Sequence, residues 1–486
     1  MSEKVSPGAA PGTSVPEGAG GLKSGAVGTP HIIAMVVAAA APITCTVSIL
    51  PLGFLLGNGI GTPGAILVVT VLLALFAVGF LCILPFIKNT GAFYAYVTAG
   101  FGRPAGLASA YMLVLAYVAL GASVIGGFGY FANNLVKRYF HLDIPWAAAG
   151  IVGVALATAL AALGVKVAGR VLLVILAIEM AAIVVLDAAV LFHNGLGSFS
   201  FDVFKPSNVF SGSIGIAGIY AFVLFLGFEA TAIYTEEAKV PERTVPRATY
   251  WVIGLVGVFH ILSSWSMVAG GGVDELVPRI AENPPLFTFG LSDQYVGSGW
   301  TDLIMIFNLL SLFAGIMAFQ NAAARYLYAL SRDRVLLRHL GRTHPRRGTP
   351  VMALTLVGVV YVIVTIIYHA ARLDPVLELG ASLIGLGTIG LLVMLSIASA
   401  SIAMFFYRRG ELAVAKVAAP TISACLLVGC AVAAILNYGT ITGVDTWWVN
   451  NLPWIYIPVV LVGLCYGIWL RRNRVDRYAK IGKTRL

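Results

Sequence analysis

The sequence predicts an all-α polytopic membrane protein with twelve transmembrane helices. Of the 486 residues, 59% are hydrophobic and only 11% are charged, and the mean hydropathy is +0.92. A soluble globule needs a more polar surface than this composition provides. Apolar runs of about 20 residues, the length that spans the hydrocarbon core, recur along the whole chain. Two of the runs are interrupted, by a proline and by a glycine, which predicts helices broken inside the membrane.

The expected spans follow one another with short connections. They are residues 31–57, 63–86, 105–133, 145–163, 170–193, 211–235, 249–270, 301–331, 351–370, 378–406, 417–437 and 452–470. Residues 1–30 are rich in Gly, Pro, Ala and Ser, so we expect a disordered tail. A cleavable signal is not expected, because the first apolar segment is long and follows no short basic start.

The distribution of basic residues predicts the orientation. With both termini in the cytoplasm, 26 of the 31 Lys and Arg residues fall in inner segments and 5 in outer loops, as the positive-inside rule requires. The net charge of +10 is therefore a sign of topology in a cell membrane. The basic C-terminal tail, residues 471–486, adds attraction to anionic lipid. A nucleic-acid partner is not expected, because the basic residues lie in separate loops.

The first and sixth spans are the interrupted ones. Pro42 lies mid-membrane after three alanines and has no amide hydrogen, so the carbonyl of Ala38 loses its helical partner. Alone, this favours a packing kink. The sixth span, however, is interrupted by Gly227 just before Phe228 and Glu229. Paired breaks in corresponding halves indicate an inverted-repeat transporter with a site at the membrane midplane. The predicted repeats are residues 31–193 and 211–406, followed by two helices in 417–470.

Three segments carry a family resemblance. They are GFEATAIYTEEAKVPERTVPRA (227–248), RYLYALSRDRVLLRHLGRTHPRRGTP (325–350) and NTGAFYAYVTAGFGRPAG (89–106). The first resembles the sixth-helix signature of the amino acid-polyamine-organocation (APC) superfamily. The second resembles its cytoplasmic segment after helix eight, and the third its re-entrant loop. The resemblance implies a LeuT-like fold of five plus five helices, with helices 1, 3, 6, 8 and 10 around the substrate. It also implies amino acid or amine transport without a cofactor.

The resemblance assigns roles residue by residue. It makes Gly227 the break glycine, Phe228 the aromatic residue over the substrate and Glu229 the acid beside it. It assigns a cytoplasmic gate to Glu236, Glu237 and Lys239. The substrate-binding stretch of the first helix is Ala39, Ala40, Ala41, Pro42, Ile43 and Thr44. Here the chain departs from the family's Gly-Ser/Ala-Gly pattern, and the alanine methyl groups would crowd a substrate carboxylate.

Glu179 is a second departure. It lies nine residues after Arg170, about 13 Å into the membrane at helical rise, where several proton-dependent relatives carry a lysine. A buried carboxylate is costly and a functional candidate, so we expect proton coupling or cation binding. A structural hydrogen bond to the first or eighth helix is the alternative. With Glu229 it makes the cavity acidic, which suits an amine, a proton or a cationic amino acid. Asp187 is expected to be solvated near the outer headgroups.

Other polar residues are weaker candidates. Tyr111 and Tyr117 in the third span lie on a helix that lines the cavity in this fold, but helix packing or an interhelical hydrogen bond is favoured over substrate binding for them. The same holds for Asn308, Ser311 and Gln320 in the eighth span. His260 lies mid-span, and either a hydrogen bond to a neighbouring helix or a proton relay accounts for it. No metal site is expected, because the cysteines and histidines lack ligand spacing.

A polytopic membrane protein of this kind belongs to one of three classes of function: a transporter, a channel, or a membrane enzyme or receptor. A channel would show a polar stripe along a pore axis, and an enzyme or receptor would need a catalytic constellation or a soluble domain. None of these features is visible in the sequence. The sequence also lacks a P-loop motif, which argues against direct use of ATP. The favoured interpretation is a secondary transporter that works by alternating access. Proton symport is the first choice of coupling, and exchange of two solutes is the alternative.

Overall fold

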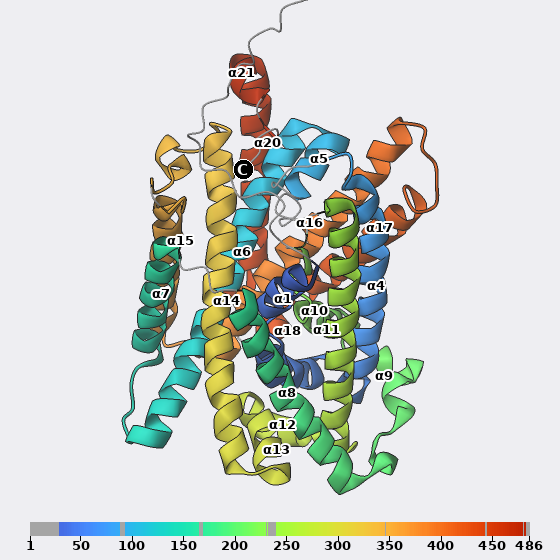
Figure 1. Ribbon diagram of the computed structural model, residues 1–486, viewed down its shortest axis with the longest axis vertical. Helices are drawn as coiled ribbons and strands as arrows, with labels where there is room; N and C mark the ends of the chain where they lie inside the picture. Colours follow the sequence, from blue (N-terminus) through green and yellow to red (C-terminus); the bar gives the residue numbers. More distant parts are fainter. Residues whose placement is uncertain are drawn as a thin grey trace, which may run out of the picture.

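A bundle of long helices forms the protein (Figure 1). The computed structural model describes residues 29–87, 93–164, 169–229, 231, 240–345, 347–442, 445–479 and 481–482. Within these ranges all regular structure is helical, and ten helices are long and apolar enough to cross a membrane. The predicted class, an all-α multi-pass membrane protein, is confirmed.

The helices differ widely in length. The long ones are α4 (Thr62–Ile83), α6 (Arg103–Phe140), α7 (Trp146–Leu163), α8 (Gly169–Asn194), α11 (Pro241–Gly271), α14 (Ser298–Arg332), α15 (Val351–Ala370), α16 (Ala381–Arg408), α17 (Ala418–Leu436) and α20 (Tyr456–Asn473). The short ones are α1 (Thr29–Ala40), α2 (Pro42–Thr44), α3 (Leu50–Leu52), α5 (Phe93–Phe101), α9 (Pro206–Val209), α10 (Ile214–Val223), α12 (Leu276–Glu282), α13 (Phe287–Tyr295), α18 (Tyr438–Thr442), α19 (Trp447–Asn450) and α21 (Val475–Tyr478).

The difference between ten spans and the predicted twelve arises at the interrupted segments. The first two predicted spans are counted as one run, Pro42–Ile83, although Gly57, with φ −93° and ψ −111°, interrupts the helix between them. The sixth contributes only the ten-residue helix α10, which is shorter than a span. A helix broken at mid-membrane does not register as a single rod. The count of twelve and the five-plus-five repeat stay predictions.

The break in the first span lies at Ala41. Helix α1 ends at Ala40, α2 begins at Pro42, and Ala41 between them is left-handed, with φ 47° and ψ 64°. The amide of Cys45 donates to the carbonyl of Ala41 at 3.0 Å and restarts the helix. A left-handed conformation costs a residue with a Cβ about 1–2 kcal/mol. The alanine that departs from the family pattern therefore holds the conformation that suits glycine.

Substitutions at Ala41 should report this strain. We expect Ala41→Gly to keep or raise the melting temperature, because the relief of about 1 kcal/mol exceeds the extra freedom of the unfolded chain. Ala41→Val should lower it, because a β-branched residue tolerates positive φ poorly. Thermal unfolding in detergent measures both. In the control Ala400→Gly, inside α16, glycine should destabilise, and a harmless Ala41→Val would contradict a left-handed Ala41.

The break in the sixth span surrounds Gly227. Helix α10 ends at Val223, and Gly227 has φ 101°. Tight turns replace the helical pattern here, since the amide of Phe225 donates to Phe222 at 3.0 Å and that of Phe228 to Phe225 at 3.1 Å. Both segments that the sequence marked as interrupted are thus broken where proline or glycine alters the backbone.

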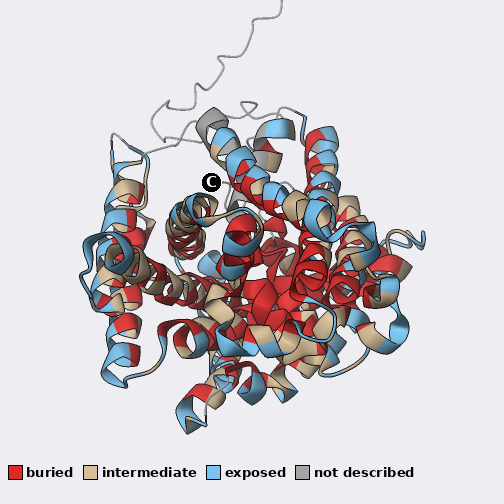
Figure 2. Cartoon of the chain, turned by 90° about the horizontal axis from the view of Figure 1, so that it is seen from below, coloured by how far each residue is buried: buried red, intermediate tan, exposed pale blue. Residues whose placement is uncertain are grey.

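The buried core occupies the middle of the bundle, and exposed residues surround it (Figure 2). Helix α6 is central and packs against α14, α16 and α20. Small residues allow this close packing: a Cβ on Gly121 of α6 would lie 1.7 Å from the hydroxyl of Tyr361 of α15. The rigid packing around α6 positions the polar side chains that project from it.

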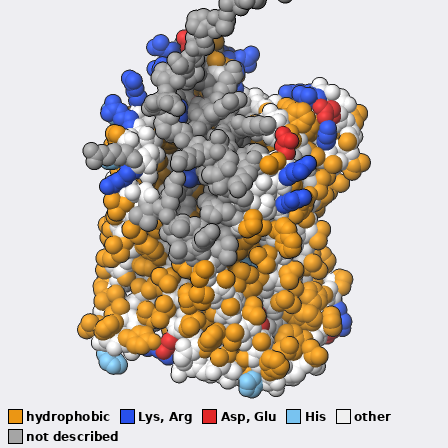
Figure 3. Space-filling model, viewed as in Figure 1, with side chains coloured by type: hydrophobic (Ala, Val, Ile, Leu, Met, Phe, Trp, Pro, Cys, Tyr) orange, Lys and Arg blue, Asp and Glu red, His pale blue; other side chains and the backbone are white. Residues whose placement is uncertain are grey.

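The outer surface divides into an apolar side and a basic end. Hydrophobic side chains cover most of the visible face, and most of the visible Lys and Arg side chains lie at the upper end (Figure 3). Helix α21 lies at that same end (Figure 1). This distribution is the one that a bilayer around the middle of the protein requires.

Candidate functional site

Glu229 follows the break in the sixth span, and its carboxylate is only 3% exposed. One oxygen, Oε2, accepts a hydrogen bond from the backbone N–H of Gly227 at 2.9 Å. The other, Oε1, accepts one from the hydroxyl of Tyr117 at 3.0 Å. The carboxylate therefore satisfies an amide at the helix break and joins the break to the middle of α6.

Tyr117 connects this site to a third element. Its ring stacks on that of Tyr326 of α14, with 5.7 Å between the centroids. The Tyr326 hydroxyl is buried and has no hydrogen-bond partner among the residues described. No ion pair joins Glu229 to a Lys or Arg within the same residues. A carboxylate that is buried without an ion-pair partner is stabilised when it takes up a proton or binds a cation.

Phe228 is packed into the core beside Glu229. Its side chain is 1% exposed, and its ring meets that of Phe76 of α4 edge to face at 6.0 Å. Its carbonyl accepts from the hydroxyl of Thr231 at 2.9 Å, and the Thr249 hydroxyl of α11 donates to Thr231 at 3.1 Å. The turn is thereby fixed to α4 on one side and to α11 on the other.

The first break is joined to α14 by a polar contact. The hydroxyl of Thr44 donates to Oδ1 of Asn308 at 3.1 Å. Asn308 is fully buried, and its Nδ2 has no partner in the described part of the chain. Ile43 and Pro42 are also buried, whereas Ala41 is half-buried. Ala40 is 4% exposed. The side chain of Ala39 lies outside what the structure describes.

Glu179 of α8 belongs to the same polar region. It is 5% exposed and accepts a hydrogen bond from the hydroxyl of Ser311 of α14 at 3.4 Å. Ser311 follows Asn308 by three residues, so the two side chains lie on one face of α14. Glu179 thus makes a hydrogen bond to α14, the eighth predicted span, which was the alternative to a coupling role, and it lies beside the contact that holds the first break. Its role in coupling stays a prediction.

His260 of α11 is fully buried. Its Nδ1 lies 2.9 Å from the carbonyl of Val256 in the same helix. Of the groups at the first break, the backbone of Pro42 lies beside the imidazole ring. The Nε2 atom has no hydrogen-bond partner within the described ranges. The imidazole therefore faces the break, and both interpretations of His260 stay predictions.

Asp187 corrects an expectation. We expected a solvated side chain near the outer headgroups, but the carboxylate accepts a hydrogen bond from the hydroxyl of Ser263 at 2.8 Å. Its side chain is half-buried between α8 and α11. The expectation was wrong because distance along a helix gives depth in the membrane and not the face on which the side chain lies.

Three predicted groups lie outside this cluster. The Tyr111 hydroxyl donates at 3.3 Å to the carbonyl of Val335, just past the C-terminal end of α14. Gln320 donates to Thr158 at 2.7 Å and to the carbonyl of Leu354 at 3.1 Å, which bridges α14 to α7 and α15. The gate residues Glu236, Glu237 and Lys239 lie outside the described residues.

Sequence reasoning missed a contact at the end of α14. Asp333 is 1% exposed and accepts from the hydroxyl of Tyr94 at 3.5 Å and from the amide of Gly482 at 3.3 Å. Burial raises the pKa of Asp333 to about 6. Ile481 beside it is 2% exposed. Residues 481–482 are therefore packed against the end of α14, which the basic composition of the tail did not indicate.

The chain resembles known transport proteins. A family model described as amino acid permease matches residues 29–464. The branched-chain amino acid permease BcaP of Bacillus subtilis (strain 168) is 26% identical over 329 residues, 64% of this chain and 66% of that protein. The methylthioribose transporter of the same organism is 26% identical over 330 residues, 64% of this chain and 67% of its own length. Asc-type amino acid transporter 1 of Mus musculus is 26% identical over 55% of this chain and 51% of the relative. The matched region thus spans about two thirds or less of these relatives.

The fold has a solved counterpart. The structure of a mutant manganese transporter of Eremococcus coleocola superposes with a TM-score of 0.56 at 13% identity, over 95% of this chain and 98% of that one. Identity this low supports the likeness of fold and not of cargo.

Proposed function

Because the chain belongs to the amino acid permease family, and the relatives that it matches are transporters and not enzymes, we propose a secondary active transporter of an amino acid or a related amine. It works by alternating access, with the solute held between the broken first and sixth helices. The observation that carries this proposal is the buried carboxylate of Glu229, which has two hydrogen-bond donors and no described cation.

The charge of Glu229 favours an ammonium group. Burial of an unpaired carboxylate is costly, and a charge-assisted hydrogen bond from an ammonium group offsets that cost. The backbone carbonyls freed where α1 and α10 end supply further acceptors around the same group. In this proposal, Phe228 and the stacked pair Tyr117 and Tyr326 form the walls that exclude water.

The relatives do not identify the solute. Two of them are equally similar to this chain at 26% identity, yet one is named for branched-chain amino acids and the other for methylthioribose. Selectivity in this fold depends on the few side chains that line the site. The amine is therefore proposed from the charge of the site and not from a relative's cargo.

Coupling to protons is the second part of the proposal. Glu179 lies beside Ser311, and Asn308 on the same face of α14 holds the first break through Thr44. A change of charge on Glu179 is thereby positioned to bias the first break between its two arrangements. We further propose cytoplasmic termini, repeats at 31–193 and 211–406, and a cell-membrane location, in keeping with the basic end of the molecule at which α21 lies.

Uptake into proteoliposomes tests the proposal. A panel of amino acids and amines should show transport of solutes that carry an ammonium group, and sole preference for dicarboxylates would overturn the acidic site. Counterflow at controlled pH separates the two modes of coupling. Uptake driven by a proton gradient without internal solute supports symport. Uptake that ignores the gradient but requires internal solute would establish exchange.

A further inference from the structure

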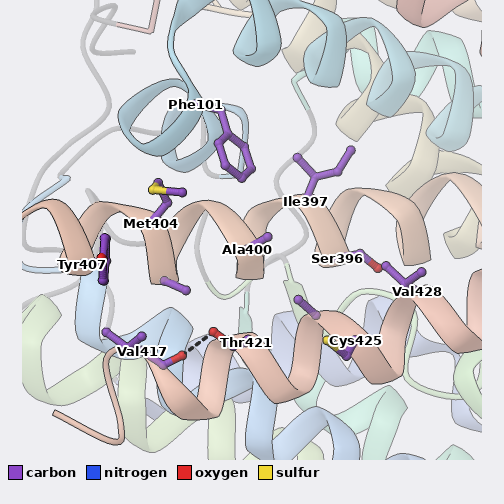
Figure 4. A pocket seen from close by; sticks show the side chains of 12 residues that line it. Phe101, Ser396, Ile397, Ala400, Met404, Tyr407, Val417, Thr421, Cys425 and Val428 are labelled. Carbon is purple, nitrogen blue, oxygen red and sulfur yellow. Dashed lines mark hydrogen bonds between the residues drawn. The ribbon is translucent and has the colours of Figure 1, made fainter. Parts of the chain in front are cut away.

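A groove of about 730 Å³ runs between α16 and α17, beside the end of α5 (Figure 4). Its depth comes from small side chains, since Ala400, Ala403 and Ala424 lie along it. Phe101 is 41% exposed and Tyr407 63% exposed at its rim. The groove therefore opens on the outside of the bundle, away from the polar cluster at the helix breaks.

The lining of the groove offers almost nothing for a polar ligand to bind. The hydroxyl groups of Ser396 and Thr421 line it, but both are used within their own helices, and the third hydroxyl, that of Tyr407, belongs to the exposed rim. Ser396 donates to the carbonyl of Leu392 and Thr421 to that of Val417, each at 2.7 Å. Apolar side chains make up most of the rest, as the labelled residues of Figure 4 show. A hydrocarbon chain fits such a surface, since no buried polar group is left without a partner.

One end of the groove is basic. Helix α16 ends at Arg408, directly after Tyr407, and Lys416 directly precedes Val417. A guanidinium nitrogen of Arg408 donates to the carbonyl of Gly100 at 2.8 Å, next to Phe101. Arg409 and Lys416 both pair with Glu411. Three cations and one carboxylate leave an excess of two positive charges at this end.

We propose that this groove binds an anionic phospholipid. An acyl chain lies along Ala400, Ala403 and Ala424, and the phosphate of the headgroup lies beside Arg409 and Lys416. The positive charge at this end of the groove favours a lipid with a negative headgroup, because basic groups between helices on the cytoplasmic side attract anionic headgroups. Tyr407 lies at the rim, and tyrosine is one of the residues that are enriched at the level of the lipid headgroups. The site is independent of the solute and of its coupling.

Thermal unfolding of the purified protein tests this site. Phosphatidylglycerol should raise the melting temperature more than phosphatidylcholine with the same chains, and inorganic phosphate should not raise it. Ala400→Phe fills the groove and should abolish the difference, whereas Val432→Phe, at an exposed position on α17 outside the groove, should keep it. Equal stabilisation by both lipids, or an unchanged difference in Ala400→Phe, would overturn the proposal, as would stabilisation by phosphate alone.

A charge variant makes the test independent of packing in the groove. Arg409→Gln combined with Lys416→Gln should weaken binding of phosphatidylglycerol about thirtyfold, because each basic residue near the surface contributes roughly a factor of five. Native mass spectrometry counts the bound lipids. Arg372→Gln, outside the groove, is the control and should bind as the wild type does. Unchanged lipid binding in the double variant would refute a headgroup site. Detection of a protein dimer whose interface covers the groove would also overturn the proposal, because a second copy of the chain would then occupy the place of the lipid.

Discussion

Glu229→Gln is expected to reduce uptake of an ammonium-bearing solute by about 10- to 100-fold. A hydrogen bond to a charged group contributes about 1.5–3 kcal/mol, and about 1.4 kcal/mol corresponds to a factor of ten. Glutamine keeps the size of the side chain but loses the negative charge. Its amide nitrogen also cannot accept the hydrogen bond that the Gly227 amide or the Tyr117 hydroxyl now donates to the carboxylate. Initial rates in proteoliposomes, normalised to folded protein, measure the loss.

Two variants frame this result. Tyr117→Phe removes one of the two donors and keeps the charge, so a smaller loss is expected. Glu282→Gln, at an exposed position of α12, removes an acid outside the site and should transport as the wild type does. Wild-type rates in Glu229→Gln would show that the carboxylate does not hold the solute.

Glu179→Gln should make transport insensitive to the proton gradient. In the proposed mechanism, Glu179 gains and loses the coupled proton beside Ser311, and glutamine has no proton to exchange at any working pH. We expect wild-type uptake to rise when the outside is acidified and the variant to show a flat response. Counterflow between equal solute pools should persist in the variant, because that exchange needs no net proton movement.

The matched controls separate charge from packing. Ser311→Ala removes the hydrogen bond but keeps the carboxylate, so uptake should still respond to the gradient. Asp187→Asn changes the second acid of α8, which Ser263 binds, and should also keep the response. If Glu179→Gln retained the wild-type dependence on the gradient, its carboxylate would have only the structural role.

The broken helices were predictable because their causes are local. Pro42 lacks an amide hydrogen and Gly227 accepts positive φ, and the chain is interrupted beside both. The exact position at Ala41 was not predictable, because alanine rarely adopts a left-handed conformation. The count of twelve spans stays a prediction, because the interrupted sixth span contributes only a ten-residue helix, which is too short to register as a span.

The acids of the site were predictable and their partners were not. Glu229 and Glu179 stand out as carboxylates in apolar runs, where any charge is costly. Tyr117 and Tyr326 meet although 209 positions separate them in the sequence, and no periodicity marks such a pair. Asp187 shows the same limit, since its depth was readable and its contact with Ser263 was not.

The most direct test of the ammonium site uses the unaltered protein and two solutes of one shape. A transported amino acid and the 2-hydroxy acid that replaces its ammonium group with a hydroxyl are compared by thermal unfolding, since a ligand that binds only the folded state raises its stability. The amino acid should raise the melting temperature in proportion to the logarithm of its concentration, and the hydroxy acid should leave it unchanged. Equal stabilisation by both solutes would contradict an ammonium group at Glu229.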